Sequence, residues 1–164
     1  PEDGVVNDIF TIDFPQNITQ VHFIKLRLFD TKGKEVANTF YWRSNDKYEG
    51  RKTLTGPTSS GFEDLSKLKQ VQLKTRYQTY QEGDRHFIKA EIKNPSSTVA
   101  FFTQLQLLGQ DKKPVRPSFY TDNFFSLLSG ESKTVIIETA ASDMPSEPTF
   151  VVKGWNIKPS SFKL

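Results

Sequence analysis

The sequence predicts an all-β protein built as an antiparallel sandwich, and three observations lead to that prediction. Short segments that alternate apolar and polar residues recur roughly every 8–12 residues with turn residues between them, which is typical of sandwiches and barrels. No stretch carries the repeat of a long amphipathic helix. Residues 122–128, DNFFSLL, are too apolar for a free loop yet lack a period of two. Such a segment is typical of a chain that is pinned into the core where it crosses between two sheets.

The first strand signals lie near the beginning of the sequence. Residues 8–14 alternate and end at Pro15, which cannot donate a hydrogen bond to a strand ladder. Residues 21–30 and 35–43 predict a hairpin, because Gly33 between them is free to adopt positive φ in a turn. We expect the alternation of residues 21–30 to be interrupted at Ile24. That irregularity would place four side chains on one apolar face: Val21, Phe23, Leu26 and Leu28.

A polar connection follows the hairpin. Residues 44–60 carry Gly50, Gly56 and Pro57 and predict a linker. Residues 62–68, FEDLSKL, predict one short helical turn, since their three large apolar side chains recur every third residue on one face.

A second series of strand signals occupies the rest of the chain. It predicts strands at residues 71–80, 86–93, 99–108, 115–120, 133–139 and 149–157. Pro117 makes the fourth of these an edge strand, and Gly154 indicates a bulge or a close backbone approach. Six strands in about 100 residues fit one complete immunoglobulin-like domain. The three strands before residue 45 are instead expected to form an extra, partial sandwich.

Composition limits the classes of partner. The chain has 164 residues, and 14 Phe offset a modest apolar content of 35%. The absence of Cys excludes disulfides, thiol catalysis and Cys-based zinc sites. The net charge of +3 is scattered rather than gathered in a stripe, so we expect no nucleic-acid partner. Apolar runs fall far short of the roughly 20 residues that a membrane span needs, so we expect no membrane partner.

An ordered series of motifs resembles glycoside hydrolase family 2, in particular enzymes of the exo-β-glucosaminidase and β-mannosidase type. The hairpin VHFIKLRLFDTKGKEVANTFYWRS is similar to the closing hairpin of the immunoglobulin-like domain that follows the catalytic barrel in those enzymes. The matching positions are Leu26, Leu28, Asp30, Gly33, Lys34, Asn38, Phe40, Tyr41 and Trp42. Residues 62–68 resemble the connector to the next domain.

The later motifs resemble the C-terminal immunoglobulin-like domain of the same enzymes. They are the Asn94-Pro95-Ser96 turn, VAFF at 99–102, DNFFSLL at 122–128 and GWN at 154–156. Ser129 departs from the usual Leu-Leu-Pro-Gly-Glu, where Pro would only preset φ of the turn.

The resemblance implies a division of the chain and a place for the catalysis. Residues 1–45 would be the final strands of a preceding immunoglobulin-like domain, residues 46–68 a linker with a short helical turn, and residues 69–164 the complete C-terminal sandwich. The barrel and its two catalytic glutamates would lie upstream. The resemblance also implies a periplasmic or extracellular location.

Within the chain itself we expect no catalytic residue, no cofactor and no metal site. Retaining glycosidases need two carboxyl groups about 5–5.5 Å apart, whereas Glu63-Asp64 and Glu131 stand at turns or element starts. Asp122 is expected to bond its own backbone in a turn. His22 and His86 are isolated and lack the spaced acids of a zinc site.

Aromatic side chains raise the question of sugar stacking. Tyr41, Trp42 and Trp155 are the candidate carbohydrate contacts. The alternative, which we favour, places Phe40 and Trp42 toward a core, Tyr41 outward or in a domain junction, and Trp155 in the core near one end of the sandwich.

Two functions remain open at this point. The first is a non-catalytic module that supports the barrel of a family 2 glycosidase acting on β-mannosides or β-glucosaminides, with upstream domains of the same polypeptide as its partners. The second is a carbohydrate-binding module whose partner is a glycan. A free-standing adhesion-type sandwich is disfavoured by the partial N-terminal sheet. Because that sheet would expose an edge and an apolar face, we expect self-association through residues 8–43, or packing of those strands onto the last domain.

Overall fold

The computed structural model describes residues 10–45 and 61–164, which form two compact units divided between Leu65 and Ser66. The first unit contains a two-stranded antiparallel ribbon of β1 (Val21–Phe29) and β2 (Glu35–Ser44). Asp30 closes its turn by accepting hydrogen bonds at one carboxylate oxygen from the backbone of Lys32 and Lys34. The hairpin prediction is therefore confirmed.

Two expectations for the first unit are wrong. Residues 10–14 form no strand, and residues 8–9 of that predicted strand lie outside the described residues. Alternation shows which faces the side chains could occupy, but a strand also needs a neighbour for its backbone groups. The register from Val21 to Leu28 is regular, and the irregularity falls between Leu28 and Phe29 rather than at Ile24.

The helical turn that the sequence predicts is present and spans the point in the sequence where the two units divide. It is the 3₁₀ segment η1 (Glu63–Lys67), in which Leu65 is buried. The second unit, Ser66–Leu164, is a sandwich of two antiparallel sheets. Its strands are β3 (Lys74–Glu82), β4 (Arg85–Lys93), β5 (Ala100–Leu108), β6 (Phe119–Tyr120), β7 (Phe125–Leu127), β8 (Ser132–Ala140), β9 (Thr149–Gly154) and β10 (Ile157–Lys163). A second short 3₁₀ turn, η2 (Ala141–Asp143), follows β8.

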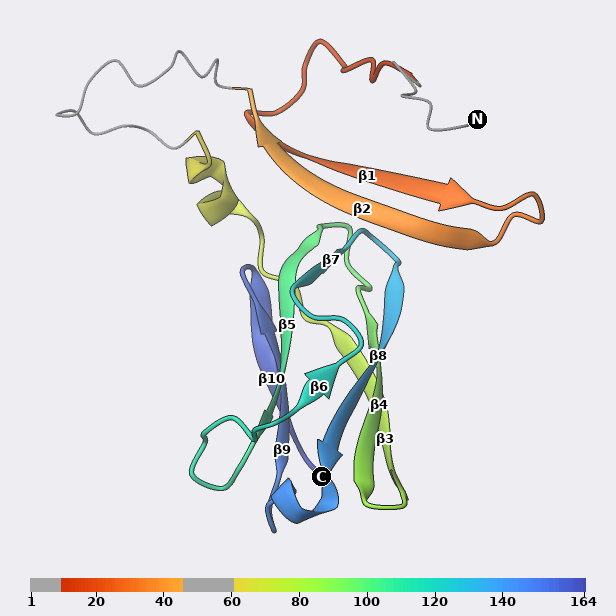
Figure 1. The fold of residues 1–164 in the computed structure, drawn as a ribbon. Coiled ribbons are helices and arrows are strands. Elements are labelled where there is room, and N and C mark those ends of the chain that lie inside the picture. Colours follow the sequence, from red (N-terminus) through yellow and green to blue (C-terminus); the bar gives the residue numbers. More distant parts are fainter. Residues whose placement is uncertain (1–9, 46–60) are drawn as a thin grey trace, which may run out of the picture. The chain divides into compact units, whose positions relative to one another are not determined.

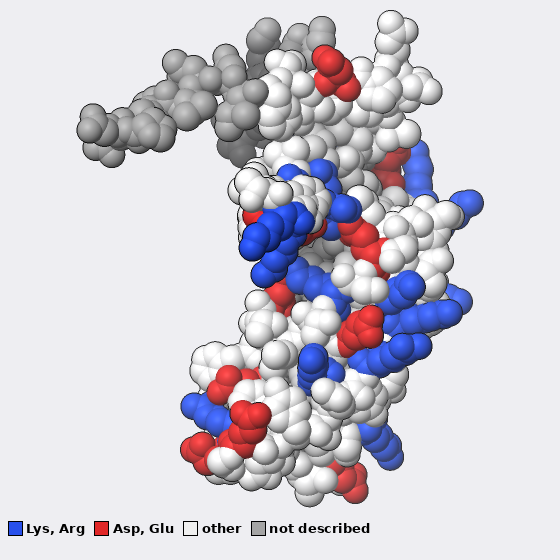
Figure 2. Space-filling model, turned by 90° about the vertical axis from the view of Figure 1, so that its right-hand side faces the viewer, with Lys and Arg blue, Asp and Glu red and all other residues white. Residues whose placement is uncertain are grey.

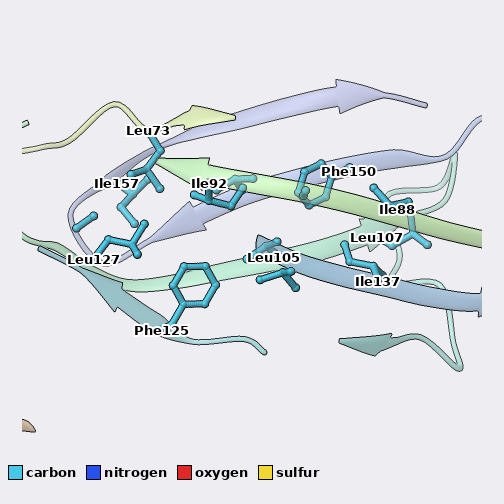
Figure 3. Packing of buried hydrophobic residues seen from close by; sticks show 14 of the residues in the cluster. Leu73, Ile88, Ile92, Leu105, Leu107, Phe125, Leu127, Ile137, Phe150 and Ile157 are labelled. Atoms are coloured by element: carbon cyan, nitrogen blue, oxygen red, sulfur yellow. The ribbon is translucent and has the colours of Figure 1, made fainter. Parts of the chain in front are cut away.

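The two sheets face each other across one core (Figure 1). One sheet has the order β10-β9-β5-β7 and the other β3-β4-β8-β6. Their inner faces interleave large apolar side chains, among them Leu105, Leu107 and Phe150 from one sheet and Ile88, Ile92 and Ile137 from the other (Figure 3). The alternating burial of β4, β5 and β8 matches the alternation in the sequence, and the predicted immunoglobulin-like sandwich is confirmed.

The sheet edges differ in length. β6 is an edge strand of two residues, as the proline at 117 leads one to expect, and β7 is an edge of three residues. Tyr120 on β6 reaches the other sheet, where its hydroxyl oxygen accepts a hydrogen bond from Leu107 N at 2.9 Å. The remaining edges are β3 and β10. β10 is missing from the sequence-based prediction, which continued β9 through residue 157.

Charges on the outer face of the β3-β4-β8 sheet are mixed. Figure 2 looks at this side and shows acidic side chains among the basic ones. Arg76 lies opposite Glu91 in the register, and Arg85 pairs with Glu138 at 3.2 Å. Both partners of that pair are well exposed, so it stabilises the fold only slightly.

Candidate functional site

The apolar corner at residues 122–128 carries the chain from one sheet to the other. It leaves β6, which pairs with β8, and enters β7, which pairs with β5. Asn123 fixes the crossing, because its side chain accepts a hydrogen bond from Leu105 N at 2.8 Å and donates one to Leu105 O at 3.0 Å. The amide thus pairs with β5 as another strand would, and the predicted crossing is confirmed.

The acidic residues around the corner have structural partners. Asp122 accepts a hydrogen bond from Asn123 N at 2.7 Å, as expected for a residue that bonds its own backbone, and it forms an ion pair with Lys133. The Lys133 ammonium also lies 5.2 Å from the centre of the Phe125 ring. Glu131 accepts a hydrogen bond from Leu128 N at 2.8 Å. Both carboxylates therefore hold the backbone of this region in place.

The tight turn between β9 and β10 lies beside the same part of β5. Asn156 is buried; its side chain accepts a hydrogen bond from Phe101 N at 2.8 Å and donates to Lys69 O at 2.9 Å and Val99 O at 2.8 Å. Gly154 confirms the predicted close approach. A Cβ atom there would lie 2.9 Å from the Phe102 carbonyl oxygen and 3.1 Å from that of Phe101.

The structure brings three exposed aromatic side chains together at this end of the sandwich. Phe102, Phe124 and Trp155 are 38%, 49% and 59% exposed. Phe102 contacts Phe124 at a centroid distance of 5.3 Å, and the buried Phe101 contacts Phe102 at 5.8 Å and Trp155 at 6.5 Å. We call the three exposed residues the aromatic end.

Backbone conformation turns two of these rings to the surface. Phe102 has φ of 57° and Phe124 has φ of 58°, in the left-handed region that bulky residues rarely adopt. Phe102 stands in a β-bulge, where two residues of β5 oppose one residue of β7. Ser126 Oγ accepts a hydrogen bond from Phe102 N at 3.2 Å, and Asn123 Oδ1 accepts one from Phe124 N at 3.1 Å.

The three predicted carbohydrate contacts do not form one group on a single element. Tyr41 and Trp42 are neighbours on β2, so their side chains point to opposite faces of the ribbon. They are 48% and 44% exposed, and Trp155 belongs to the other unit. The expected core positions of Trp42 and Trp155 are therefore wrong. Trp155 faces outward because the tight turn directs its neighbour Asn156 inward instead.

Sequence reasoning missed Phe102 and the role of Asn156. A signal for the first was present, since adjacent side chains on a strand point to opposite faces. Each of the doublets Phe101-Phe102 and Phe124-Phe125 must then send one ring outward. No local pattern marks Asn156, whose partners are distant in sequence.

The described residues hold neither a metal-binding cluster nor a membrane-spanning helix. Across residues 10–45 and 61–164, histidine and acidic side chains do not gather in threes as a metal ion would require. No helix in these ranges has the length and apolar character to cross a membrane.

Comparison with known proteins extends these observations. The family described as the exo-beta-D-glucosaminidase Ig-fold domain matches residues 53–157. The exo-beta-D-glucosaminidase of Streptomyces avermitilis is 30% identical over 149 residues, which cover 85% of this chain and 16% of that protein. The enzyme of the same name from Amycolatopsis orientalis is 27% identical over 157 residues, covering 89% and 15%.

A solved structure shares the fold. The crystal structure of Amycolatopsis orientalis exo-chitosanase CsxA superposes with a TM-score of 0.79 and 22% identity, over 94% of this chain and 19% of that one. The chain thus spans about one-sixth of the length of the curated relatives it matches. The resemblance to enzymes of the exo-β-glucosaminidase type in glycoside hydrolase family 2 is confirmed, and the chain belongs to the family of exo-beta-D-glucosaminidase Ig-fold domains.

Proposed function

We propose that this chain is a non-catalytic accessory module of a family 2 glycoside hydrolase that acts on β-glucosaminides or β-mannosides, and that it supports the catalytic barrel. The observation that carries the proposal is the family match itself. The exo-beta-D-glucosaminidase Ig-fold domain matches residues 53–157, and the two relatives that the chain matches are each about six times as long as this chain. On this proposal residues 1–45 are the last strands of a preceding immunoglobulin-like domain.

The local chemistry supports a non-catalytic role. A retaining glycosidase needs one carboxyl group free to attack and another free to transfer a proton. Asp122 is held by Lys133 and by a backbone N–H, and Glu131 is held by a backbone N–H. Each carboxylate is therefore already engaged in holding the structure together.

The proposal is tested by assaying hydrolysis of 4-nitrophenyl β-D-glucosaminide and 4-nitrophenyl β-D-mannoside. We expect no turnover by the 164-residue chain and turnover by the full-length parent protein. Deleting Ser66–Leu164 from the parent should lower its thermal midpoint and its activity together. Turnover by the 164-residue chain alone would contradict the proposal. So would a parent protein whose thermal midpoint and activity do not change on the deletion. Fractionation of the producing cells tests the accompanying proposal of a periplasmic or extracellular location.

A carbohydrate-binding module is the second candidate, and the exposure of Tyr41, Trp42 and Trp155 favours it. Isothermal titration of the chain with glucosamine or mannose oligosaccharides tests it. Saturable binding that is lost on Trp42→Ala, Tyr41→Ala or Trp155→Ala would support this candidate. Binding that is unchanged by all three substitutions would show that these aromatic side chains do not contact the sugar.

A further inference from the structure

The outer face of the β10-β9-β5 sheet carries a cavity of about 470 Å³ where β5 and β10 end and β9 begins. Its size is that of a small-molecule site. The core-facing side chains of these strands include Leu107, Phe150 and Phe162. Their neighbours Leu108 and Val151 therefore point the other way and give the cavity an apolar floor. We call this cavity, which lies between residues 108–112, 146–151 and 161–163, the outer groove.

Three hydroxyl groups line the outer groove. Thr149 and Ser161 stand on β9 and β10, and Ser146 stands in the loop before β9. Within residues 61–164 none of the three hydroxyl groups has a hydrogen-bond partner, so all three are available to a ligand. A hydroxyl group both donates and accepts hydrogen bonds, which matches the hydroxyl groups of a sugar.

The outer groove has more positive than negative charge. Lys112 and Lys163 line it, and in the part of the chain that the structure describes neither forms an ion pair. Glu147 is the one acidic side chain among the described residues that line the groove, and its Oε2 atom accepts a hydrogen bond from Gln110 Nε2 at 3.4 Å. The two ammonium groups therefore favour an anionic ligand over a cationic one.

The backbone is strained at one of these lysines. Lys112 has φ of 60°, in the left-handed region. The turn between β1 and β2 has glycine at the matching place, Gly33, with φ of 78°. In both turns an aspartate accepts a hydrogen bond from the backbone of the residue that follows, Lys34 in one and Lys113 in the other. Glycine would relieve the strain at 112, and such strain gathers at ligand sites.

We propose that the outer groove binds an acidic oligosaccharide, a sugar chain that carries carboxylate groups. The ammonium groups of Lys112 and Lys163 pair with the carboxylates, and the hydroxyl groups of the groove bond those of the sugar. Carbon atoms of the sugar ring pack on Leu108 and Val151. The groove contains none of the aromatic candidates for sugar contact. The inference goes beyond the accessory function, which requires no ligand.

Titration of the 164-residue chain with galacturonate oligosaccharides, followed by heteronuclear NMR, tests the proposal. The amide signals of residues 108–112, 146–151 and 161–163 should shift saturably. Mannose oligosaccharides, which are uncharged, should bind more weakly, and protonated glucosamine oligosaccharides more weakly still. Added salt should weaken the binding of galacturonate, because it screens exposed charges.

The double variant Lys112→Gly, Lys163→Gln should weaken galacturonate binding at least about tenfold, which corresponds to about 1.4 kcal/mol. Glycine suits the left-handed backbone at 112, so the variant is expected to fold, and its thermal midpoint checks this. The matched control is Lys158→Gln. Lys158 is also an exposed lysine of β10 but does not line the groove, so its loss should leave the affinity unchanged.

Three results would overturn the proposal. The first is the absence of saturable shifts with galacturonate. The second is a double variant that binds as the wild type does, or that loses no more affinity than Lys158→Gln, since the attraction would then be unspecific. The third is binding of glucosamine oligosaccharides as tight as that of galacturonate. None of these results bears on the accessory function, which the deletion of Ser66–Leu164 from the parent tests separately.

Discussion

Two buried asparagine side chains, one after β4 and one in the turn between β9 and β10, bond backbone groups of other segments. Asn94 donates to the carbonyl oxygens of Thr98 and Leu127 at 2.8 and 3.0 Å, and its own oxygen accepts from Ser96 N at 3.0 Å. Asn156 makes the three bonds described above. A primary amide suits such positions because it carries both donors and an acceptor on one short side chain.

We expect Asn156→Ala to destabilise the sandwich by about 3 kcal/mol or more, because each buried group left without a partner costs about 1–3 kcal/mol. Urea denaturation of the chain measures the effect. The exposed Gln72, which bonds Ser160, offers a control, and Gln72→Ala should change the free energy of unfolding by less than about 0.5 kcal/mol. Equal effects of the two substitutions would show that the Asn156 bonds contribute little.

Tyr120 predicts an alkaline loss of stability. Burial raises the pKa of its hydroxyl above the ordinary value of 10.0, although the hydrogen bond from Leu107 acts in the opposite direction. The unfolded chain therefore loses this proton first as the pH rises. The stability contribution is complete below pH 10 and falls as the pH rises through the folded pKa.

Denaturation of the wild type and of Tyr120→Phe at a series of pH values tests this expectation. The stability of the wild type should decline more steeply above pH 10 than that of the variant. Parallel curves would show that Tyr120 does not contribute to the alkaline transition.

At the scale of elements, the β1–β2 ribbon differs from the sheets of the sandwich. Two-stranded sheets are marginal in water, and this one displays large apolar side chains. Leu28, Phe29, Val36, Tyr41 and Trp42 are all exposed. The two faces of the ribbon carry different apolar side chains. Tyr41 lies opposite Ile24 on one face, and Trp42 lies opposite Phe23 on the other.

The expectation of self-association through residues 8–43 stays a prediction, now centred on this ribbon. Sedimentation velocity over a series of concentrations should show reversible association of the chain. Leu28→Lys, which places a charge on the exposed apolar face, should weaken it. Phe119→Lys on the sandwich should not, and a chain that stays monomeric throughout the series would refute the prediction.

The local sequence pattern predicted some strands correctly and failed to predict others, for identifiable reasons. Residues 88–93 alternate apolar and charged side chains because one face of β4 is buried, and the short apolar run in residues 133–139 marks β8, so both positions were predictable. β10 was missed because Pro159 and two serines weaken its signal, and its pairing with β9 depends on a turn of two residues. The aromatic end was only partly predictable: each Phe doublet must send one ring outward, but a bulge and two left-handed residues decide which ring that is.

At the scale of the whole molecule, the second unit contains a complete core. Every residue of the buried cluster lies between Val71 and Ile157, within Ser66–Leu164. The Ig-fold family match also ends at residue 157, inside this unit. The buried apolar cluster and the family match thus coincide in the sandwich.

We therefore expect Ser66–Leu164 to fold without the preceding residues. Its free energy of unfolding should lie within about 1 kcal/mol of that of the sandwich in the full chain, since no residue of the buried cluster is removed. Heteronuclear NMR and urea denaturation measure this. A collapsed spectrum or a molten transition would show that the sandwich depends on the segment before it.

The edges of the sandwich bear on fibre formation. An unpaired edge strand can form hydrogen bonds with a second copy of the chain and so begin a fibre. Proteins commonly prevent this with short edge strands or with charged residues and proline on the edge. Here β6 and β7 are too short to serve as templates, β3 carries Lys74 and Arg76, and Pro159 interrupts the donors of β10. Each open edge of the sandwich thus carries a feature that disfavours amyloid-like growth.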